Sequence, residues 1–281
     1  NAAAFSYPQN QWFSVKVVSD LTADLGEFWI NGTKIHTWQW TKGTFGSPTI
    51  VKQLDGNDFF GYTANDEMYI DDYNIVHSPY TTKISSTPTG GNWNSNSTWV
   101  GNNAPNPNAV VEIVSSATVT LTNDRNRNAL TIIKGTLNCG TNNITGSGDF
   151  ILSSGATLQI GSTNGITSSG ATGNIRVTGA RTFNQLANYI YNGTAAQVTG
   201  NGLPSTVKNL TINNAAGVTL SANTSVNGAL ILISGNLLTN TNTLSLGTSV
   251  TNPGSLNVTS GKTIGNFNRW ISNSSNILFP V

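Results

Sequence analysis

The sequence has 281 residues, and with 13 basic and 12 acidic side chains only 9% of them are charged, for a net charge of +1. Soluble domains usually carry about 25% charged residues, whereas here 39 Asn, 29 Gly and a large excess of Thr and Ser take their place. This composition argues against general attraction to nucleic acid or to anionic membranes. No apolar run approaches the ~18 residues of a membrane span.

The single cysteine, Cys139, excludes an intramolecular disulfide and a cysteine metal cluster. The chain opens at Asn1 without an initiator Met and stops in the apolar run 276–281. We therefore expect a fragment of a longer protein, truncated at its C-terminal end.

Charge and aromatic content divide the chain into two parts. Residues 1–80 hold nine acids and four lysines, 4 − 9 = −5, and residues 81–281 hold three acids and nine bases, 9 − 3 = +6. Turn-forming residues are concentrated over 78–91. We predict one domain over 1–77, a linker over 78–91 and a second domain over 92–281.

The first part has the pattern of β-strands. Residues 12–18 alternate as a half-buried strand does, and 27–30 and 33–38 flank Asn31-Gly32, the pair that a type I′ hairpin turn requires. A last strand is predicted over 67–75. These strands resemble the C-terminal part of a concanavalin A-like (laminin G-like) jelly roll, which implies a partial β-sandwich.

Two candidate sites lie in this first part. Trp38 and Trp40 are two residues apart and so share one face of a strand, where they would either stack on sugar rings or fill the sandwich core. A calcium site is the second candidate, because the resembled jelly rolls often hold a structural Ca²⁺ at a sheet edge and carboxylates suit that ion. Solvated turn carboxylates are the alternative. The proposed ligands are Asp55, Asp58, Asp71 and Asp72.

The second part of the chain contains a pattern of short strands that recurs about every twenty residues. Leu137 and Leu158 are twenty-one residues apart and Leu210 and Leu230 twenty, close to one coil of a β-solenoid. An antiparallel sandwich of hairpins would give a similar period and stays the alternative. The fold class predicted is all-β, a partial jelly-roll sandwich followed by a β-solenoid (parallel β-helix-like) repeat region. Short strands are expected at 110–114, 118–121, 129–133, 149–152, 157–160, 209–212, 217–220, 229–232, 243–246 and 255–258.

The sequence also predicts where individual side chains of the second part lie. Trp93 and Trp99 are expected to plug the open end of the solenoid, because a cap must cover the first coil. Arg125 and Arg127, beside Asp124, are interpreted as a solvated loop between strands. Only Glu112, Asp124 and Asp149 are acidic after residue 80, and no His occurs there. The chain is therefore predicted not to be an enzyme.

The entry to this part looks like a recurring module, made of residues 90–101 with Trp93 and Trp99, Pro105-Asn106-Pro107, and the strands at 110–113 and 117–121. This module, and the later run 208–220, are similar to repeat regions of large secreted surface proteins and adhesins of the Bacteroidota. The resemblance implies export by the type IX system, extracellular or cell-surface location, adhesion and, in some members, gliding motility.

Together these observations predict a non-enzymatic fragment of a secreted cell-surface adhesin, a stalk with a lectin-like contact module. Its partners would be an extracellular polysaccharide or surface ligand and other segments of the same large protein. Two alternatives are a carbohydrate-binding accessory region of a polysaccharide-degrading enzyme and a structural filament or surface-layer subunit.

Overall fold

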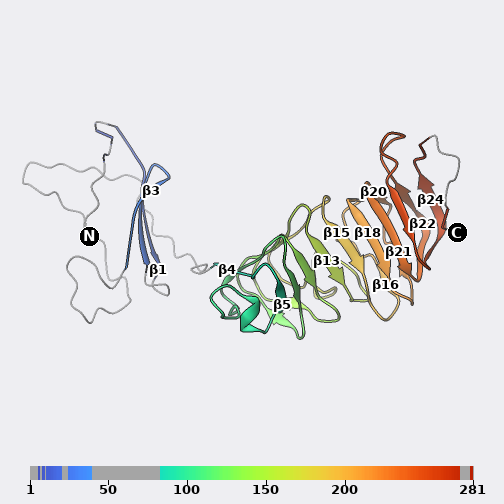
Figure 1. The fold of residues 1–281 in the computed structure, drawn as a ribbon, viewed down its shortest axis with the longest axis horizontal. Helices are drawn as coiled ribbons and strands as arrows, with labels where there is room; N and C mark the ends of the chain where they lie inside the picture. The colour runs from blue at the N-terminus through green and yellow to red at the C-terminus, as the bar shows by residue number, and fades with distance from the viewer. Residues whose placement is uncertain are drawn as a thin grey trace, which may run out of the picture. The chain divides into compact units, whose positions relative to one another are not determined.

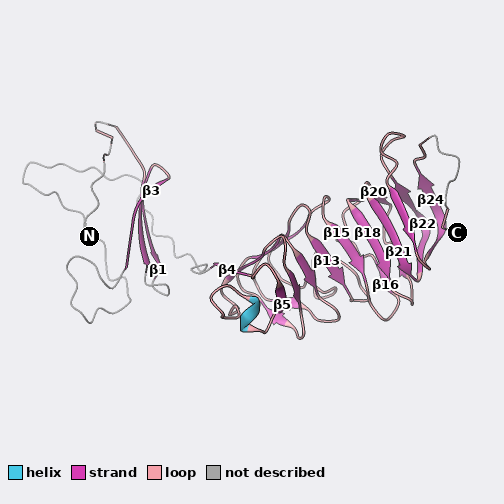
Figure 2. Ribbon diagram, viewed as in Figure 1, coloured by secondary structure: helices cyan, strands magenta, loops and turns pink. Residues whose placement is uncertain are grey.

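A computed structural model describes residues 6, 8–9, 11–20, 25–39, 83–272 and 279–280. The chain divides into two compact units, residues 1–82 and 83–281, and each is described by itself. All regular structure in the described residues is β apart from a short 3₁₀ helix, η2 (Asn96–Thr98) (Figure 2). The prediction of an all-β chain is confirmed.

The first unit contributes an antiparallel sheet of β1 (Val15–Asp20), β2 (Leu25–Ile30) and β3 (Thr33–Gln39). Asn31 and Gly32 join β2 to β3 with φ angles of 47° and 77°, as the predicted type I′ turn requires. The predicted closing strand at 67–75 lies outside the described residues. The jelly-roll assignment therefore stays a prediction.

The second unit is a stack of coils in which every pair of named strands is parallel, within the described residues. This pairing selects the solenoid over the sandwich of hairpins. The largest sheet takes one strand from each coil, and its strands run side by side (Figure 1). They are β5 (Gly90–Asn92), β7 (Thr118–Thr120), β10 (Thr136–Asn138), β13 (Thr157–Ile160), β15 (Asn188–Tyr191), β18 (Asn209–Asn213), β21 (Ala229–Ser234) and β23 (Ser255–Val258).

Three further parallel sheets complete the coils. The five-stranded sheet contains β4 (Lys83–Ser85), β6 (Val110–Ile113), β9 (Thr131–Ile133), β12 (Phe150–Leu152) and β14 (Arg181–Phe183). The two-stranded sheet contains β8 (Arg125–Asn126) and β11 (Ile144–Thr145). The six-stranded sheet contains β16 (Gln197–Val198), β17 (Thr206–Val207), β19 (Val218–Thr219), β20 (Thr224–Val226), β22 (Asn236–Leu246) and β24 (Lys262–Arg269).

A ladder of inward side chains forms the core of the eight-stranded sheet. Leu137 pairs with Leu158, and Leu210 pairs with Leu230, so the twenty- and twenty-one-residue spacings are single coils as predicted. Burying one such side chain stabilises the fold by about 1.5–3 kcal/mol, and no coil could bury its own without a neighbour. The fully buried members of the ladder, all 0% exposed, are Val119, Leu137, Leu158, Tyr189, Leu210 and Leu230.

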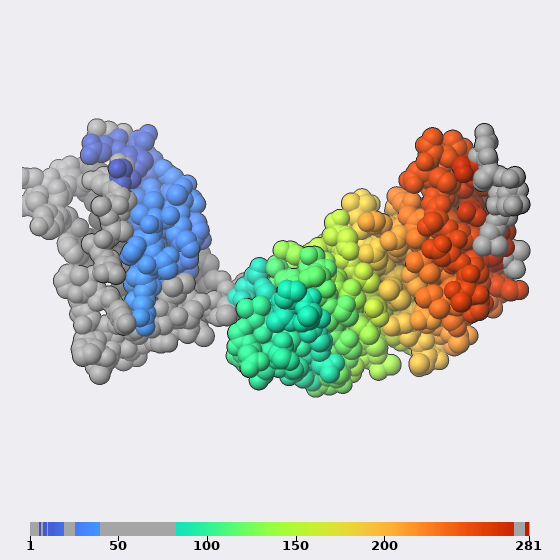
Figure 3. Space-filling model, viewed as in Figure 1, coloured from blue at the N-terminus to red at the C-terminus, as the bar shows by residue number. Residues whose placement is uncertain are grey.

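The first coil begins inside the segment that was predicted to be a linker, because β4 and β5 lie at residues 83–92. Gly90 adopts a φ of 66°, and an added Cβ would lie 2.1 Å from the carbonyl oxygen of Thr118 in the next coil. Glycine is needed there for close stacking of two backbones, so the Gly-Gly pair marks a packed strand instead of a linker. In the space-filling view the coils then follow one another in chain order (Figure 3).

Candidate functional site

Two tryptophans fill the first coil. Trp93 and Trp99 are each 1% exposed, and their rings meet edge to face with centroids 5.0 Å apart. The indole N–H of Trp99 donates to the carbonyl oxygen of Trp93 at 2.8 Å, so the buried polar atom is satisfied. Their predicted place in the first coil is confirmed.

Arg127 belongs to the same buried cluster, and its predicted place in a solvated loop is wrong. The side chain is 1% exposed, and its guanidinium donates to the carbonyl oxygens of Asn106 and Ala109 and lies 5.8 Å from the Trp93 ring centroid. Burial lowers its pKa to about 10, so it remains protonated at neutral pH. Asp124 is exposed, as predicted, and accepts a hydrogen bond from the Asn143 backbone N–H at 2.8 Å.

The sites predicted in the first unit are described only in part. Trp38 lies half-buried on β3, opposite Gly26 of β2, where an added Cβ at residue 26 would come within 2.2 Å of the indole. The ring of His36 stacks beside it at 6.3 Å between centroids. Glycine at 26 therefore makes room for the indole against the sheet.

The remaining predicted residues, Trp40, Asp55, Asp58, Asp71 and Asp72, lie outside the described residues. The sugar platform and the calcium site thus stay predictions. In the described ranges, no three His, Cys, Asp or Glu side chains lie close enough together to hold a metal ion.

A long loop interrupts the solenoid between β13 and β14, over residues 161–180. Arg181, the first residue of β14, holds this loop in place. Its Nε donates to the Val177 carbonyl at 2.9 Å, and its Nη1 donates to the Thr167 carbonyl at 3.1 Å and hydroxyl at 3.0 Å. Its Nη2 donates to the Gly170 carbonyl. Partial burial lowers the pKa of Arg181, but these carbonyl acceptors favour the charged form.

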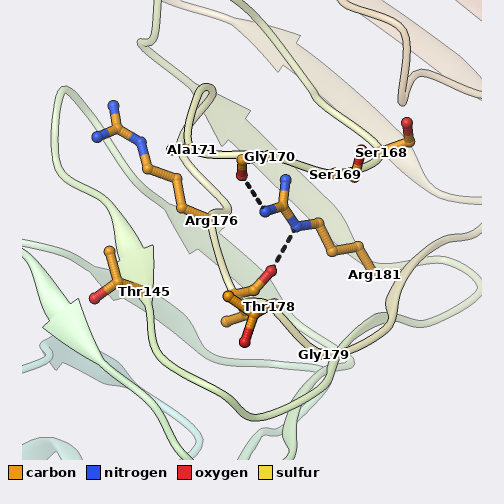
Figure 4. Close-up of a pocket in the computed structure, with 10 residues that line it drawn as sticks. Thr145, Ser168, Ser169, Gly170, Ala171, Arg176, Thr178, Gly179 and Arg181 are labelled. Carbon is orange, nitrogen blue, oxygen red and sulfur yellow. Dashed lines mark hydrogen bonds between the residues drawn. The ribbon is translucent and has the colours of Figure 1, made fainter.

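This loop borders a groove of about 540 Å³ over β11 and the segment before β14 (Figure 4). The Arg181 side chain lies across the groove beside Gly170, whereas the Arg176 guanidinium points away from it (Figure 4). The Arg176 Nε donates to the Gly173 carbonyl at 2.7 Å. The lining residues are Thr145, Ser168, Ser169, Gly170, Ala171, Arg176, Val177, Thr178, Gly179 and Arg181.

Few polar groups of the groove are available to a ligand. The Arg181 guanidinium already donates to the Val177, Thr167 and Gly170 carbonyls, and the Arg176 guanidinium points away from the groove. The Ser168 and Ser169 hydroxyls are left to donate to a ligand. The lining set holds no His, Cys, Asp or Glu, so it supplies no general base and no nucleophile paired with one.

Sequence reasoning missed this groove, although the sequence carries a signal for it. The ladder step from Leu158 to Tyr189 is 189 − 158 = 31 residues, where the preceding step is 21. A lengthened step in a regular repeat indicates an inserted loop, which is where repeat proteins often place contacts. That signal would have pointed to Arg176, within the insertion, and to Arg181, directly after it.

Comparison with known families gives one match. Residues 98–199, just over a third of the chain, match the family described as the G8 domain. The matched segment runs from η2 to the end of β16 and contains Trp99, Arg127 and the whole groove. G8 domains are typical of extracellular proteins, so the match indicates an extracellular module of a larger protein.

No curated protein and no solved structure matches the chain. Within the described ranges, no helix has the length and apolar character needed to cross a lipid bilayer.

Proposed function

We propose that this chain is a non-catalytic spacer of a large secreted surface protein of the adhesin type. The observation that carries the proposal is the ladder of paired, fully buried side chains from Val119 to Leu230. Each rung is fixed by the coil before it and the coil after it, so the stack resists bending more than a chain of linked domains does. A rigid spacer holds contact modules at a set distance from a surface.

Three further observations support this role. The groove lacks an acid–base pair among its lining residues, the matched G8 family is typical of extracellular proteins, and few side chains are charged. A surface with little charge limits nonspecific electrostatic association. The resemblance of residues 90–121 and 208–220 to adhesins of the Bacteroidota supports display on a bacterial surface after type IX export.

The contact function is assigned to the first unit, as a lectin-like module. Trp38 and Trp40 would stack on sugar rings, and a Ca²⁺ ion held by Asp55, Asp58, Asp71 and Asp72 would order the loops around them.

Spin-label distances test the spacer. Cysteines introduced by Thr118→Cys on β7 and Asn257→Cys on β23 face solvent, and Cys139 is fully buried and does not compete for the label. Six pairing steps separate these strands, which at about 4.8 Å per step gives about 29 Å along the stack. Double electron–electron resonance is expected to give one narrow distance distribution near that value. A broad distribution would overturn the spacer assignment.

Binding assays test the contact function. The full chain is incubated with immobilised polysaccharides in calcium or in chelator, beside the Trp38→Ala/Trp40→Ala variant. Binding that needs calcium and is lost in the variant would support the lectin-like module. Release of new reducing ends by the purified chain would instead show an enzyme.

A further inference from the structure

The outward side of the eight-stranded sheet carries no charged side chain. Residues on either side of the inward ladder point outward, because side chains alternate along a strand. Each strand thus contributes two positions to what we call the outer face. The outer face consists of Gly90, Asn92, Thr118, Thr120, Thr136, Asn138, Thr157, Gln159, Asn188, Ile190, Asn209, Thr211, Ala229, Ile231, Ser255 and Asn257.

This neutrality is particular to the outer face, since residues 81–281 carry nine bases and three acids. On the neighbouring five-stranded sheet, Glu112 accepts from Lys83 at 3.0 Å and from Lys134 at 2.8 Å. The groove holds Arg176 and Arg181. These five charged groups therefore lie on other sides of the solenoid.

Part of the outer face is occupied with its own hydrogen bonds, and part is open. Asn209 donates to the Asn188 side-chain oxygen at 2.7 Å, which fixes the amides of adjacent coils in one row. In the part of the chain that the structure describes, the hydroxyls of Thr118, Thr120 and Thr136 have no hydrogen-bond partner. Thr118 and Thr136 pair on adjacent strands, so equivalent hydroxyls recur at about 4.8 Å along the stack.

We propose that the outer face binds an uncharged linear polysaccharide whose chain follows the stacked coils. Hydroxyl and amide groups both donate and accept, so they match sugar hydroxyls in either orientation. The paired Thr118 and Thr136 hydroxyls lie one strand spacing apart along the stack, and the half-buried Ile190 and Ile231 offer apolar surface to ring C–H groups.

Charge and composition favour this partner over the other classes. Nucleic acid and anionic polysaccharide need basic side chains, of which the outer face has none. Protein interfaces are typically anchored by aromatic residues or arginine, and the outer face holds neither. The inference goes beyond the spacer role and does not depend on it, because a flexible stack could still bind a sugar chain.

The test uses the full chain mixed with microcrystalline cellulose, insoluble chitin or granular starch, followed by sedimentation. The variant Thr118→Glu/Thr136→Glu places two carboxylates on the outer face. The matched control, Thr182→Glu, adds a carboxylate at an exposed position on β14 of the five-stranded sheet. Circular dichroism and melting temperature check that all three proteins fold alike.

The wild type is expected to sediment with at least one of the three polysaccharides, equally in low and high salt. The double variant is expected to bind about tenfold more weakly, which is about 1.4 kcal/mol, and the control to bind like wild type. A Thr118→Lys/Thr136→Lys variant should lose binding equally, since either charge must be desolvated.

The proposal is overturned if no neutral polysaccharide is bound, or if the control loses as much binding as the double variant. Binding to anionic polysaccharide alone, abolished by salt, would also overturn it and would assign the contact to the basic groove.

Discussion

Truncating Trp93 to alanine should destabilise the first coil selectively. Trp93 is 1% exposed, and truncating a buried tryptophan costs about 3–5 kcal/mol. The change also removes the edge-to-face contact with Trp99 and the aromatic face under the Arg127 guanidinium. With each of these contacts contributing about 0.5–1.5 kcal/mol, the total loss should be about 4–8 kcal/mol.

The loss should be local, because stacked repeats are stabilised by nearest neighbours. Hydrogen exchange followed by mass spectrometry should show faster exchange in β4 and β5 and unchanged protection in β18. Trp12→Ala is the matched control, since Trp12 is 71% exposed and its truncation should change the stability by less than about 0.5 kcal/mol. Equal effects of the two substitutions, or uniform loss of protection along the solenoid, would refute the argument that Trp93 caps the first coil.

Three further perturbations follow from single contacts. Gly235→Ala should destabilise the protein far more than Gly170→Ala. Both glycines have positive φ angles, 77° and 80° respectively. At Gly235 an added Cβ would lie 1.7 Å from the carbonyl oxygen of Asn214, whereas at Gly170 it would meet open space. Melting temperatures of the two variants decide this, and equal losses would contradict it. The Cys139 thiol is buried and its pKa is raised to about 12, so Ellman's reagent at pH 8 should label it only in urea; rapid native labelling would contradict the burial. The hydrogen bond from Lys134 lowers the pKa of Glu112 below its usual 4.5 in the folded protein. The unfolded chain therefore binds a proton at Glu112 more readily than the folded chain does. The free energy of unfolding should then fall as the pH drops below about 4.5. Melting curves at pH 7 and pH 3.5 should show a smaller acid loss in Glu112→Gln, and an equal loss in the variant would rule this out.

The repeat was predictable from the sequence because it follows from the regular spacing of leucines along the chain. A leucine every twenty or twenty-one residues, between runs of Asn, Gly, Ser and Thr, predicts short strands whose inward side chains need neighbours. The pairs Leu137 with Leu158 and Leu210 with Leu230 then follow from the period alone. The hairpin at Asn31-Gly32 was equally local, because only residues that tolerate positive φ fit a type I′ turn.

The linker assignment shows where such local rules mislead. Gly90-Gly91 has the composition of a flexible connection, yet Gly90 is required where the first coil approaches the second at backbone distance. A local pattern cannot distinguish a glycine in a flexible linker from a glycine that lets two backbones pack closely. That distinction depends on the neighbouring strand, whose Thr118 is 118 − 90 = 28 residues away in the chain.

The groove and the buried Arg127 were harder to predict from the sequence. Arg127 is set in a polar run, and its burial is possible only because the first coil brings two carbonyl oxygens and the Trp93 ring around the guanidinium. Arg181 likewise finds its carbonyl acceptors in a loop that folds back over its own coil.

The sequence by itself thus determined the fold class, the coil period and the inward ladder, since hydrophobic spacing and turn chemistry act over a few residues. The tertiary structure decided between the predicted parallel pairing and the hairpin alternative, and it alone showed that Arg127 is buried and that uncharged residues from eight coils meet on one face. These features depend on contacts between segments twenty to thirty residues apart, and the free energy of such contacts exists only once the coils are stacked.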